Sequence, residues 1–156
     1  MIIINVPGAG EINLKHVVFD VNGTLAVDGK LLPSIVDLLE DLREHLNIHL
    51  LTADTHGKQI EIDEQLNLEA VRVQAGDEMR QKAEYINHLG ANQTAAVGQG
   101  ANDGLMLEAA RIGICVISAE GTALDTLLKA DLVVPDITSA LEILLNPTRL
   151  KASLRK

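Results

Sequence analysis

Short apolar segments alternate with helical patterns along almost the whole chain, and this alternation constrains the fold more than any other feature. Residues 48–51, 94–97 and 114–117 are mostly apolar runs, of the kind found in strands that are covered on both faces. Each of them is followed by a segment with helical periodicity. The pattern predicts an α/β fold: a three-layer, Rossmann-like arrangement with a parallel sheet between two layers of helices.

The individual elements follow from the same periodicities. The predicted strands are 2–6, 12–19, 48–51, 70–74, 94–97, 114–117 and 132–134, and the predicted helices are 33–46, 58–66, 77–89, one starting near 102, 122–129 and 137–145. The PGAGE segment between the first two strands reads as a turn, so an N-terminal β-hairpin is expected. We expect one domain over 1–156, with 1–13 as the hairpin strand, 14–145 as the core and 146–156 as a basic tail.

Charge and composition exclude several classes of partner. The net charge of −9 disfavours a nucleic-acid partner, as does the presence of only two aromatic residues, Phe19 and Tyr85. No apolar stretch is long enough to cross a membrane, and the N-terminal apolar run is too short for a signal peptide. The lone Cys115 reads as a buried structural thiol. A cytoplasmic enzyme or binding domain is expected.

Polar residues stand where predicted strands end, which is where parallel sheets bind ligands. Asp20 ends one strand beside the turn Asn22-Gly23-Thr24. A carboxylate in that position can attack phosphorus while backbone N–H groups hold the phosphoryl oxygens. The alternative is an ordinary Asx turn.

Three further segments suit the same chemistry, each with a plainer alternative. Thr52 could donate a hydrogen bond to phosphate or cap the following helix. Lys82 could neutralise carboxylate and phosphate, although a lysine on a helix is normally solvated. The glycine-rich segment 98–103 suits close approach to a metal-bound phosphate, but Asp103 could merely stabilise a helix start.

In this order, Asp20, Thr52, Lys82 and segment 98–103 resemble the four signature motifs of the haloacid-dehalogenase-like phosphotransferase superfamily. The resemblance is closest to the phosphorylation domain of P-type ATPases. FDVNGTLA is similar to their aspartate-Lys-Thr-Gly-Thr-Leu segment, LLTADT to their Leu-Thr-Gly-Asp-Asn, and the match covers about residues 14–145. Only 32 positions separate Asp20 from Thr52 and 30 separate Thr52 from Lys82, so the chain is expected to be capless.

The resemblance implies an Mg²⁺-dependent phosphohydrolase or phosphotransferase that acts on small phosphorylated metabolites through an aspartyl-phosphate on Asp20. The implied catalytic residues are Asp20, Asn22, Thr52 and Lys82. Phosphate would be bound by Asp20, Val21, Asn22, Gly23, Thr52, Ala53 and Lys82. The metal would be held by Asp20, the Asn22 carbonyl, Gln99 and Asp103, with Asn102 in support.

Two departures from the family pattern limit the expected rate. Asn22 stands where phosphatases of the family usually have a second Asp, and an amide cannot exchange the proton whose transfer is typically worth about 10²–10⁴-fold. Gln99 stands where a carboxylate usually contacts Mg²⁺, so weaker metal binding is expected.

An enzyme that accepts phosphate on Asp20 and releases it slowly is therefore the leading interpretation. The alternative is a degraded core that serves as a binding or regulatory module. Dehalogenation is disfavoured, because those relatives generally carry a cap that supplies halide contacts. Without a cap the site is expected to be open, with room for a second copy of the chain to cover it.

Overall fold

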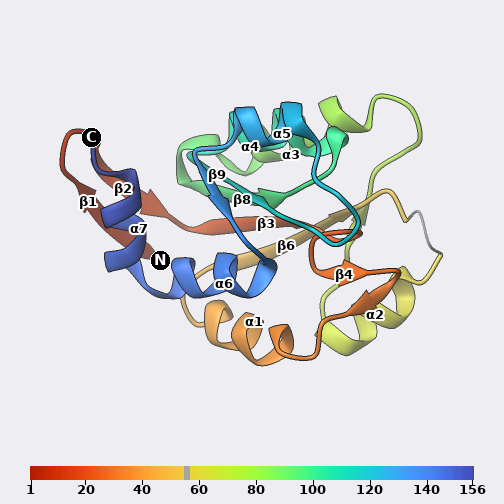
Figure 1. Ribbon diagram of the computed structural model, residues 1–156. Helices are drawn as coiled ribbons and strands as arrows, with labels where there is room; N and C mark the ends of the chain where they lie inside the picture. Colours follow the sequence, from red (N-terminus) through yellow and green to blue (C-terminus); the bar gives the residue numbers. More distant parts are fainter. Residues whose placement is uncertain (55–56) are drawn as a thin grey trace.

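A six-stranded parallel sheet forms the centre of the protein, in a computed structural model that describes residues 1–54 and 57–156 (Figure 1). The strand order is β10-β9-β8-β3-β6-β7, and every neighbouring pair is parallel. The strands are β3 (His16–Asp20), β6 (Asn47–Thr52), β7 (Val71–Arg72), β8 (Thr94–Gly98), β9 (Ile112–Val116) and β10 (Leu132–Val134). The predicted parallel sheet is confirmed.

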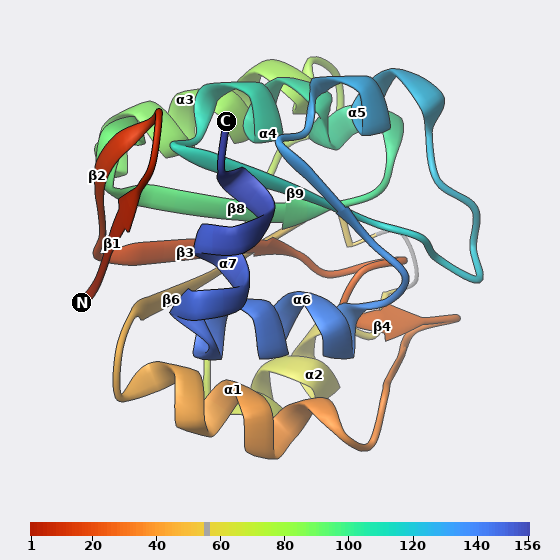
Figure 2. The same cartoon turned by 60° about the vertical axis from the view of Figure 1, so that its left-hand side comes forward.

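Helices cover both faces of this sheet. They are α1 (Ile35–Arg43), α2 (Gln59–Leu66), α3 (Glu78–Leu89), α4 (Gly104–Ala109), α5 (Leu124–Lys129), α6 (Ile137–Leu145) and α7 (Pro147–Leu154), with the short 3₁₀ turns η1 (Ala91–Gln93) and η2 (Ala101–Asp103). Figures 1 and 2 show α3, α4 and α5 on one face and α1, α2 and α6 on the other. The three-layer arrangement is therefore also confirmed.

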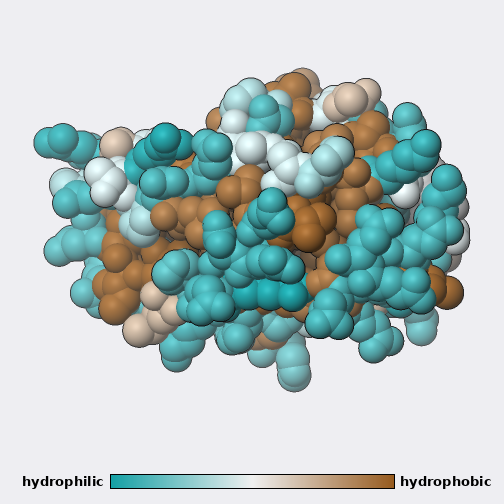
Figure 3. Space-filling view, turned by 90° about the horizontal axis from the view of Figure 1, so that it is seen from below, coloured by the Kyte–Doolittle hydropathy of each residue, from teal (hydrophilic) through white to brown (hydrophobic). Residues whose placement is uncertain are grey.

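The core is aliphatic and lies on both sides of the sheet, because successive strand residues point to opposite faces. Phe19 of β3 belongs to the cluster beneath α1 and α6, whereas its neighbour Val18 belongs to the cluster beneath α3 and α4. Helix α1 turns Leu39 and Leu42 into the first cluster. Figure 3 views this side of the molecule and shows hydrophilic side chains interspersed with apolar surface.

The N-terminal hairpin is present, but the predicted strand 12–19 is two strands. β1 (Ile2–Val6) pairs antiparallel with β2 (Gly10–Leu14), and β3 then enters the central sheet. The break falls at Lys15, whose backbone N–H donates to Gln93 at 2.8 Å and whose carbonyl accepts from Asn47 at 2.9 Å. The polar pair Lys15-His16 is the only local mark of the change, and periodicity alone does not identify it as the end of one strand and the start of another.

The C-terminal segment predicted as a basic tail, residues 146–156, is helical over most of its length. Helix α7 buries Leu150 completely and packs on β1. The backbone N–H of Lys156 donates to the Pro7 carbonyl at 3.3 Å, which places the end of the chain beside the hairpin turn (Figure 2). Leu150 therefore anchors a segment whose other features, among them four basic residues, are typical of a solvated surface.

The chain between the first and second site segments forms only small elements. A hairpin of β4 (Ala26–Val27) and β5 (Lys30–Leu31) precedes α1 and β6. Among the described residues, α2 and β7 are the elements between β6 and α3, so the capless expectation is confirmed for that part of the chain. Thr55, which ends the LLTADT segment, lies outside the described residues. Within the described chain, no helix is long and apolar enough to span a membrane.

Two histidines and a tyrosine join β3, β6 and α3 on the face beneath α3. His16 Nδ1 lies 3.1 Å from His49 Nε2, and His49 Nδ1 lies 3.1 Å from the Tyr85 hydroxyl. Burial lowers the pKa of both imidazoles, with the charge of Lys15 adding to the effect on His16 and that of His16 to the effect on His49. The folded protein therefore favours the neutral form of both rings.

We expect this histidine pair to make the fold acid-sensitive. A histidine of the unfolded chain takes up a proton near pH 6.5, whereas the folded pair resists protonation until a lower pH, so the free energy of unfolding falls as pH drops below about 6.5. Urea denaturation between about pH 7 and 5 should show a shallower fall in His16→Gln/His49→Gln than in the parent chain. His88→Gln, at an exposed site on α3, is the matched control. Parallel profiles for the parent and the double variant would contradict the assignment.

Candidate active site

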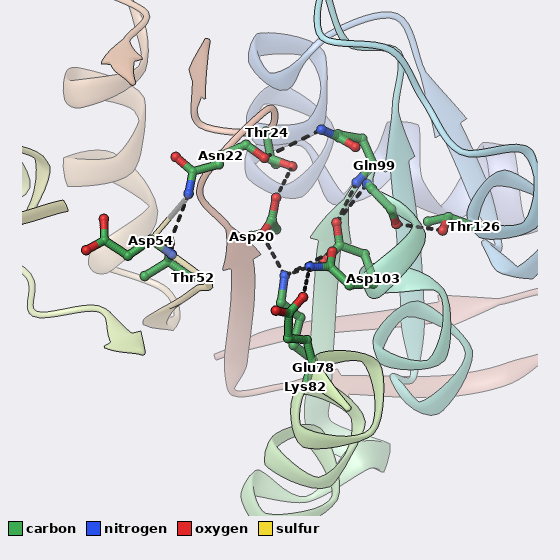
Figure 4. Close-up of polar contacts among 12 residues, drawn as sticks. Asp20, Asn22, Thr24, Thr52, Asp54, Glu78, Lys82, Gln99, Asp103 and Thr126 are labelled. Atoms are coloured by element: carbon green, nitrogen blue, oxygen red, sulfur yellow. Dashed lines mark hydrogen bonds and ion pairs between the residues drawn. The ribbon is translucent and has the colours of Figure 1, made fainter. Parts of the chain in front are cut away.

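The residues singled out from the sequence gather where β3, β6 and β8 end (Figure 4). Asp20 is the last residue of β3 and lies opposite Leu51 of the adjacent β6. Thr52 ends β6, and Gln99 directly follows β8. Because the carboxyl ends of parallel strands share one edge of a sheet, the predicted residues lie close together.

A buried lysine connects the two carboxylates of this site. Lys82 Nζ lies 2.7 Å from Asp20 Oδ1 and 2.7 Å from Asp103 Oδ1. Lys82 and Asp103 are fully buried, and Asp20 is 5% exposed. The alternative of a solvated surface lysine is therefore wrong. Burial of an ammonium is tolerated here because two carboxylates accept its hydrogen bonds.

The net charge of this trio depends on the ionisation of Asp20. Burial and the charge of Asp103 raise the pKa of Asp20 to about 7, against the opposing effect of Lys82. Burial alone would lower the pKa of Lys82, but the two adjacent carboxylates outweigh it and the net shift is upward. One ammonium between two carboxylates leaves an excess of negative charge when both are ionised.

A tight turn between β8 and α4 holds Asp103. Its Oδ2 accepts hydrogen bonds from the backbone N–H groups of Gln99, at 3.0 Å, and Gly100, at 2.9 Å. A Cβ atom on Gly98 would come within 2.7 Å of the Asp103 carboxyl, so this position requires glycine. Asp103 therefore faces the site in addition to preceding α4. Stabilisation of a helix start, the plainer alternative, does not account for its contact with Lys82.

Residues 20–26, which we call the nucleophile loop because they contain the predicted nucleophile Asp20, turn sharply after β3. Thr24 Oγ1 donates to Asp20 Oδ2 at 3.0 Å, and the Gly23 N–H donates to the Ala26 carbonyl at 2.7 Å. Gly23 has a φ of +82°, which favours glycine. The Asp20 carboxylate thus bonds the side chains of Lys82 and Thr24. Thr24 was not singled out from the sequence, although it lies in the D-x-N-G-T segment.

Asn22 and Thr52 join the nucleophile loop to the end of β6. Asn22 Nδ2 donates to Thr52 Oγ1 at 3.1 Å, and the same oxygen accepts from the Asp54 N–H at 2.9 Å. The next helix, α2, starts only at Gln59, so Thr52 does not cap it. Val21 and Ala53 directly follow β3 and β6, which puts the predicted phosphate-binding backbone at this edge of the sheet.

Asn102 contacts Lys82 and brings in a residue that the sequence did not suggest. Lys82 Nζ lies 3.5 Å from Asn102 Oδ1, and Asn102 Nδ2 donates to Glu78 Oε2 at 3.2 Å (Figure 4). Glu78 stands one turn before Lys82 on α3, so the two side chains share a helix face. In the sequence, only this four-residue spacing from Lys82 could have pointed to Glu78.

Gln99 contacts Asn22 through nitrogen rather than oxygen. Its Nε2 lies 3.5 Å from the Asn22 carbonyl oxygen, the atom expected to bind metal, and the residue is only 7% exposed. The predicted metal set therefore contains the Asp20 and Asp103 carboxylates and the Asn22 carbonyl, but no oxygen from Gln99. No cluster of three or more His, Cys, Asp or Glu residues with metal-binding geometry occurs among the described residues. The remaining oxygen donors and their excess negative charge fit a hard divalent cation.

Comparison with solved structures identifies the fold. The chain resembles the cobalt-bound deoxy-D-mannose-octulosonate 8-phosphate phosphatase of Haemophilus influenzae, with a TM-score of 0.71 and 15% identity over 86% of this chain and 89% of that chain. It also resembles the corresponding Moraxella catarrhalis enzyme in complex with magnesium ion, phosphate ion and KDO, with a TM-score of 0.65 and 18% identity over 86% and 87% of the two chains. The protein has the fold of the haloacid-dehalogenase-like hydrolases.

The P-type resemblance also has a structural counterpart. A zinc-transporting PIB-type ATPase in the E2.Pi state matches 80% of this chain with 26% identity and a TM-score of 0.59, over 20% of the ATPase. An uncharacterized protein of Methanocaldococcus jannaschii is 53% identical over 60 residues, which cover 38% of this chain and 64% of that protein, less than two thirds of its length. No family model matches the chain.

We expect Lys82 to stabilise the fold strongly. Lys82→Met leaves two buried carboxylates without their shared cation, and breaking a buried pair in this way typically costs about 3–5 kcal/mol. Lys82→Met/Asp103→Asn should recover part of the loss, because one of the unpaired charges is removed. Urea denaturation at pH 8 measures both effects, with Lys129→Met, which removes a partly exposed ion pair with Glu108, as the control. A loss in Lys82→Met no larger than in the control would refute the prediction.

Proposed function

We propose that the protein is an Mg²⁺-dependent phosphohydrolase or phosphotransferase that acts on small phosphorylated molecules through an aspartyl-phosphate on Asp20. The observation that carries this proposal is the buried Lys82, which lies 2.7 Å from both Asp20 and Asp103 at the ligand-binding edge of the sheet. Similarity to proteins that are themselves named phosphatases supports it.

In the first proposed step, an oxygen of Asp20 attacks phosphorus, an Asp20 O–P bond forms, and the bond from phosphorus to the leaving oxygen breaks. Lys82 keeps its proton and offsets charge on Asp20 and the transferred group. We expect the Thr52 hydroxyl and the backbone N–H groups of Val21, Asn22 and Ala53 to bind phosphoryl oxygens. The N–H of Gly23, which was also predicted to bind phosphate, already donates to the Ala26 carbonyl. A divalent cation held by Asp20, the Asn22 carbonyl and Asp103 would supply further positive charge to them.

Proton transfer is the weak point of the proposed reaction. The leaving oxygen needs a proton in the first step, and water must lose one when it attacks the aspartyl-phosphate and releases Asp20. The Asn22 amide can do neither, and its nitrogen is already bonded to Thr52. A substrate with a good leaving group, such as an acyl phosphate, avoids the first requirement, but slow hydrolysis of the intermediate remains.

The substrate's organic part has room beside the nucleophile loop. A cavity of about 280 Å³ is bounded by Gly23 and Thr24 and lined mainly by apolar side chains, among them Val27, Leu32 and Ile117. Among the residues that the structure describes, no lysine, arginine or histidine lines it, whereas the carboxylate of Asp136 does. We propose that the group attached to phosphorus is small and carries no negative charge, and that a second copy of the chain could cover the open side.

The second candidate function is a binding or regulatory module, which the Asn22 amide specifically favours. Such a module would bind phosphate at the same edge without turning it over. The two functions differ in whether Asp20 is required for release of inorganic phosphate.

We expect Asp20→Asn to abolish release of phosphate from acetyl phosphate with Mg²⁺, and Asn22→Asp to increase it by up to about 10²–10⁴-fold through restored proton transfer. Asn5→Asp, which adds the same charge on the exposed hairpin, should change nothing. Intact-mass analysis of fresh protein should accompany the assay, because deamidation of Asn22-Gly23 would create the active variant. If the parent chain, Asp20→Asn and Asn22→Asp are equally inert, and fluoroberyllate with Mg²⁺ fails to raise the melting temperature, the module is the better description.

We expect Gln99→Asp to bind Mg²⁺ at least about tenfold more tightly than the parent chain, because it adds a charged oxygen ligand for a hard cation. Isothermal titration at millimolar Mg²⁺ measures the difference. Gln65→Asp makes the same charge change at an exposed position of α2 and is the control. Equal affinities of Gln99→Asp and the parent chain would show that position 99 does not contact the metal.

A further inference from the structure

The backbone of Gln99 is fixed on both sides, so only its side chain can adjust. Its N–H donates to Asp103 Oδ2 at 3.0 Å, and its carbonyl accepts from the Ala123 N–H at 2.9 Å. These bonds tie the residue to the turn that holds Asp103 and to the segment before α5. Whatever Gln99 does at the site, it does through its amide group.

That amide lies against the nucleophile loop. A Cβ atom built on Gly23 would come within 1.8 Å of Gln99 Nε2 and 2.9 Å of its Cδ, so the side chain fills the space that any residue larger than glycine would need. The same nitrogen points at the Asn22 carbonyl (Figure 4). The absence of a side chain at Gly23 thus leaves the space that the side chain of Gln99 occupies.

Every proposed metal-binding oxygen already has a donor from this chain. Asp20 accepts from Lys82 and Thr24, and Asp103 accepts from Lys82 and two backbone N–H groups. The Asn22 carbonyl faces the Gln99 amide nitrogen, which carries the positive end of the amide dipole. A cation and the amide N–H are both attracted to this carbonyl oxygen, so the two would compete for it.

We infer that Gln99 is a positioning residue that holds the nucleophile loop against the Asp103 turn without a metal ion, and that a divalent cation must displace its amide to reach the Asn22 carbonyl. The inference rests on the proposed function in one respect, the assignment of the Asn22 carbonyl as a metal ligand. Gln99 then competes with the metal, whereas a glutamine that bound through its oxygen would add to metal affinity.

The packing half of the inference is tested by a double-mutant cycle in EDTA. Gly23→Ala should lower the urea midpoint of the parent chain more than it lowers that of Gln99→Ala, because truncation of Gln99 removes the clash and leaves only the strain of a positive φ. Equal shifts in the two backgrounds would overturn the contact. Gly121→Ala is the control for backbone strain alone, because Gly121 also has a positive φ but a Cβ atom there would meet nothing within 4 Å.

The competition half is tested by metal binding alone. Titration with Mg²⁺, and with Mn²⁺ as a paramagnetic probe, should show Gln99→Ala binding more tightly than the parent chain, because no amide has to be displaced. Equal affinity would mean that Gln99 does not compete with the metal, and weaker binding would mean that Gln99 supplies an oxygen ligand; either result would overturn the inference. This test remains valid if Gly23→Ala fails to fold. Neither measurement depends on turnover, so failure of the proposed activity in the Asp20→Asn assay would be seen separately.

Discussion

The buried contact of Lys82 with Asp20 and Asp103 is the interaction on which the rest of the site depends. The three side chains come from β3, α3 and the turn after β8, and each lies 2.7 Å from its partner. Burial penalises every one of these charges, so none is stable there without the others. The parallel sheet brings the ends of β3 and β8 together, and α3 packs beneath them so that one lysine reaches both carboxylates. The fold therefore brings the three charges together, and their mutual attraction in turn holds β3, α3 and the turn after β8 in place.

Two neutral amides stand where the related family places carboxylates, and both have a structural contact. Asn22 donates to Thr52, and Gln99 points its nitrogen at the Asn22 carbonyl. A line of hydrogen bonds thus runs from the end of β6, across the nucleophile loop, to the turn after β8. Carboxylates at these two positions would add negative charge beside Asp20, whose pKa is already raised to about 7 by burial and by Asp103. The amides avoid that repulsion, and on the proposed function they do so at the expense of proton transfer and of metal affinity.

The sequence predicted the parts of this arrangement that follow from strand ends and chain order. Asp20, Thr52 and Gln99 could be placed together because parallel strands end at one edge, and Lys82 and Asp103 because the order of motifs resembles a known family. The contact of Asn102 with Glu78 and the direction of the Gln99 amide could not be predicted, since both depend on side-chain packing between segments distant in sequence. The break at Lys15 and the anchoring of α7 by Leu150 were missed for a related reason: local periodicity does not report which partner an apolar residue meets.

The Gln99 contact and a metal-dependent reaction are compatible once the charge of the substrate is counted. With Asp20 and Asp103 ionised and Lys82 protonated, the trio carries one excess negative charge, and an arriving phosphate adds more. The Coulomb attraction for a divalent cation therefore grows when phosphate binds, whereas the amide contact with the Asn22 carbonyl does not change in strength. Because linkage is reciprocal, a cation and phosphate that bind this site must favour each other's binding. On the proposed function, the resting site is held together by the chain's own amides, and the phosphorylated substrate itself supplies the charge that draws the metal into place.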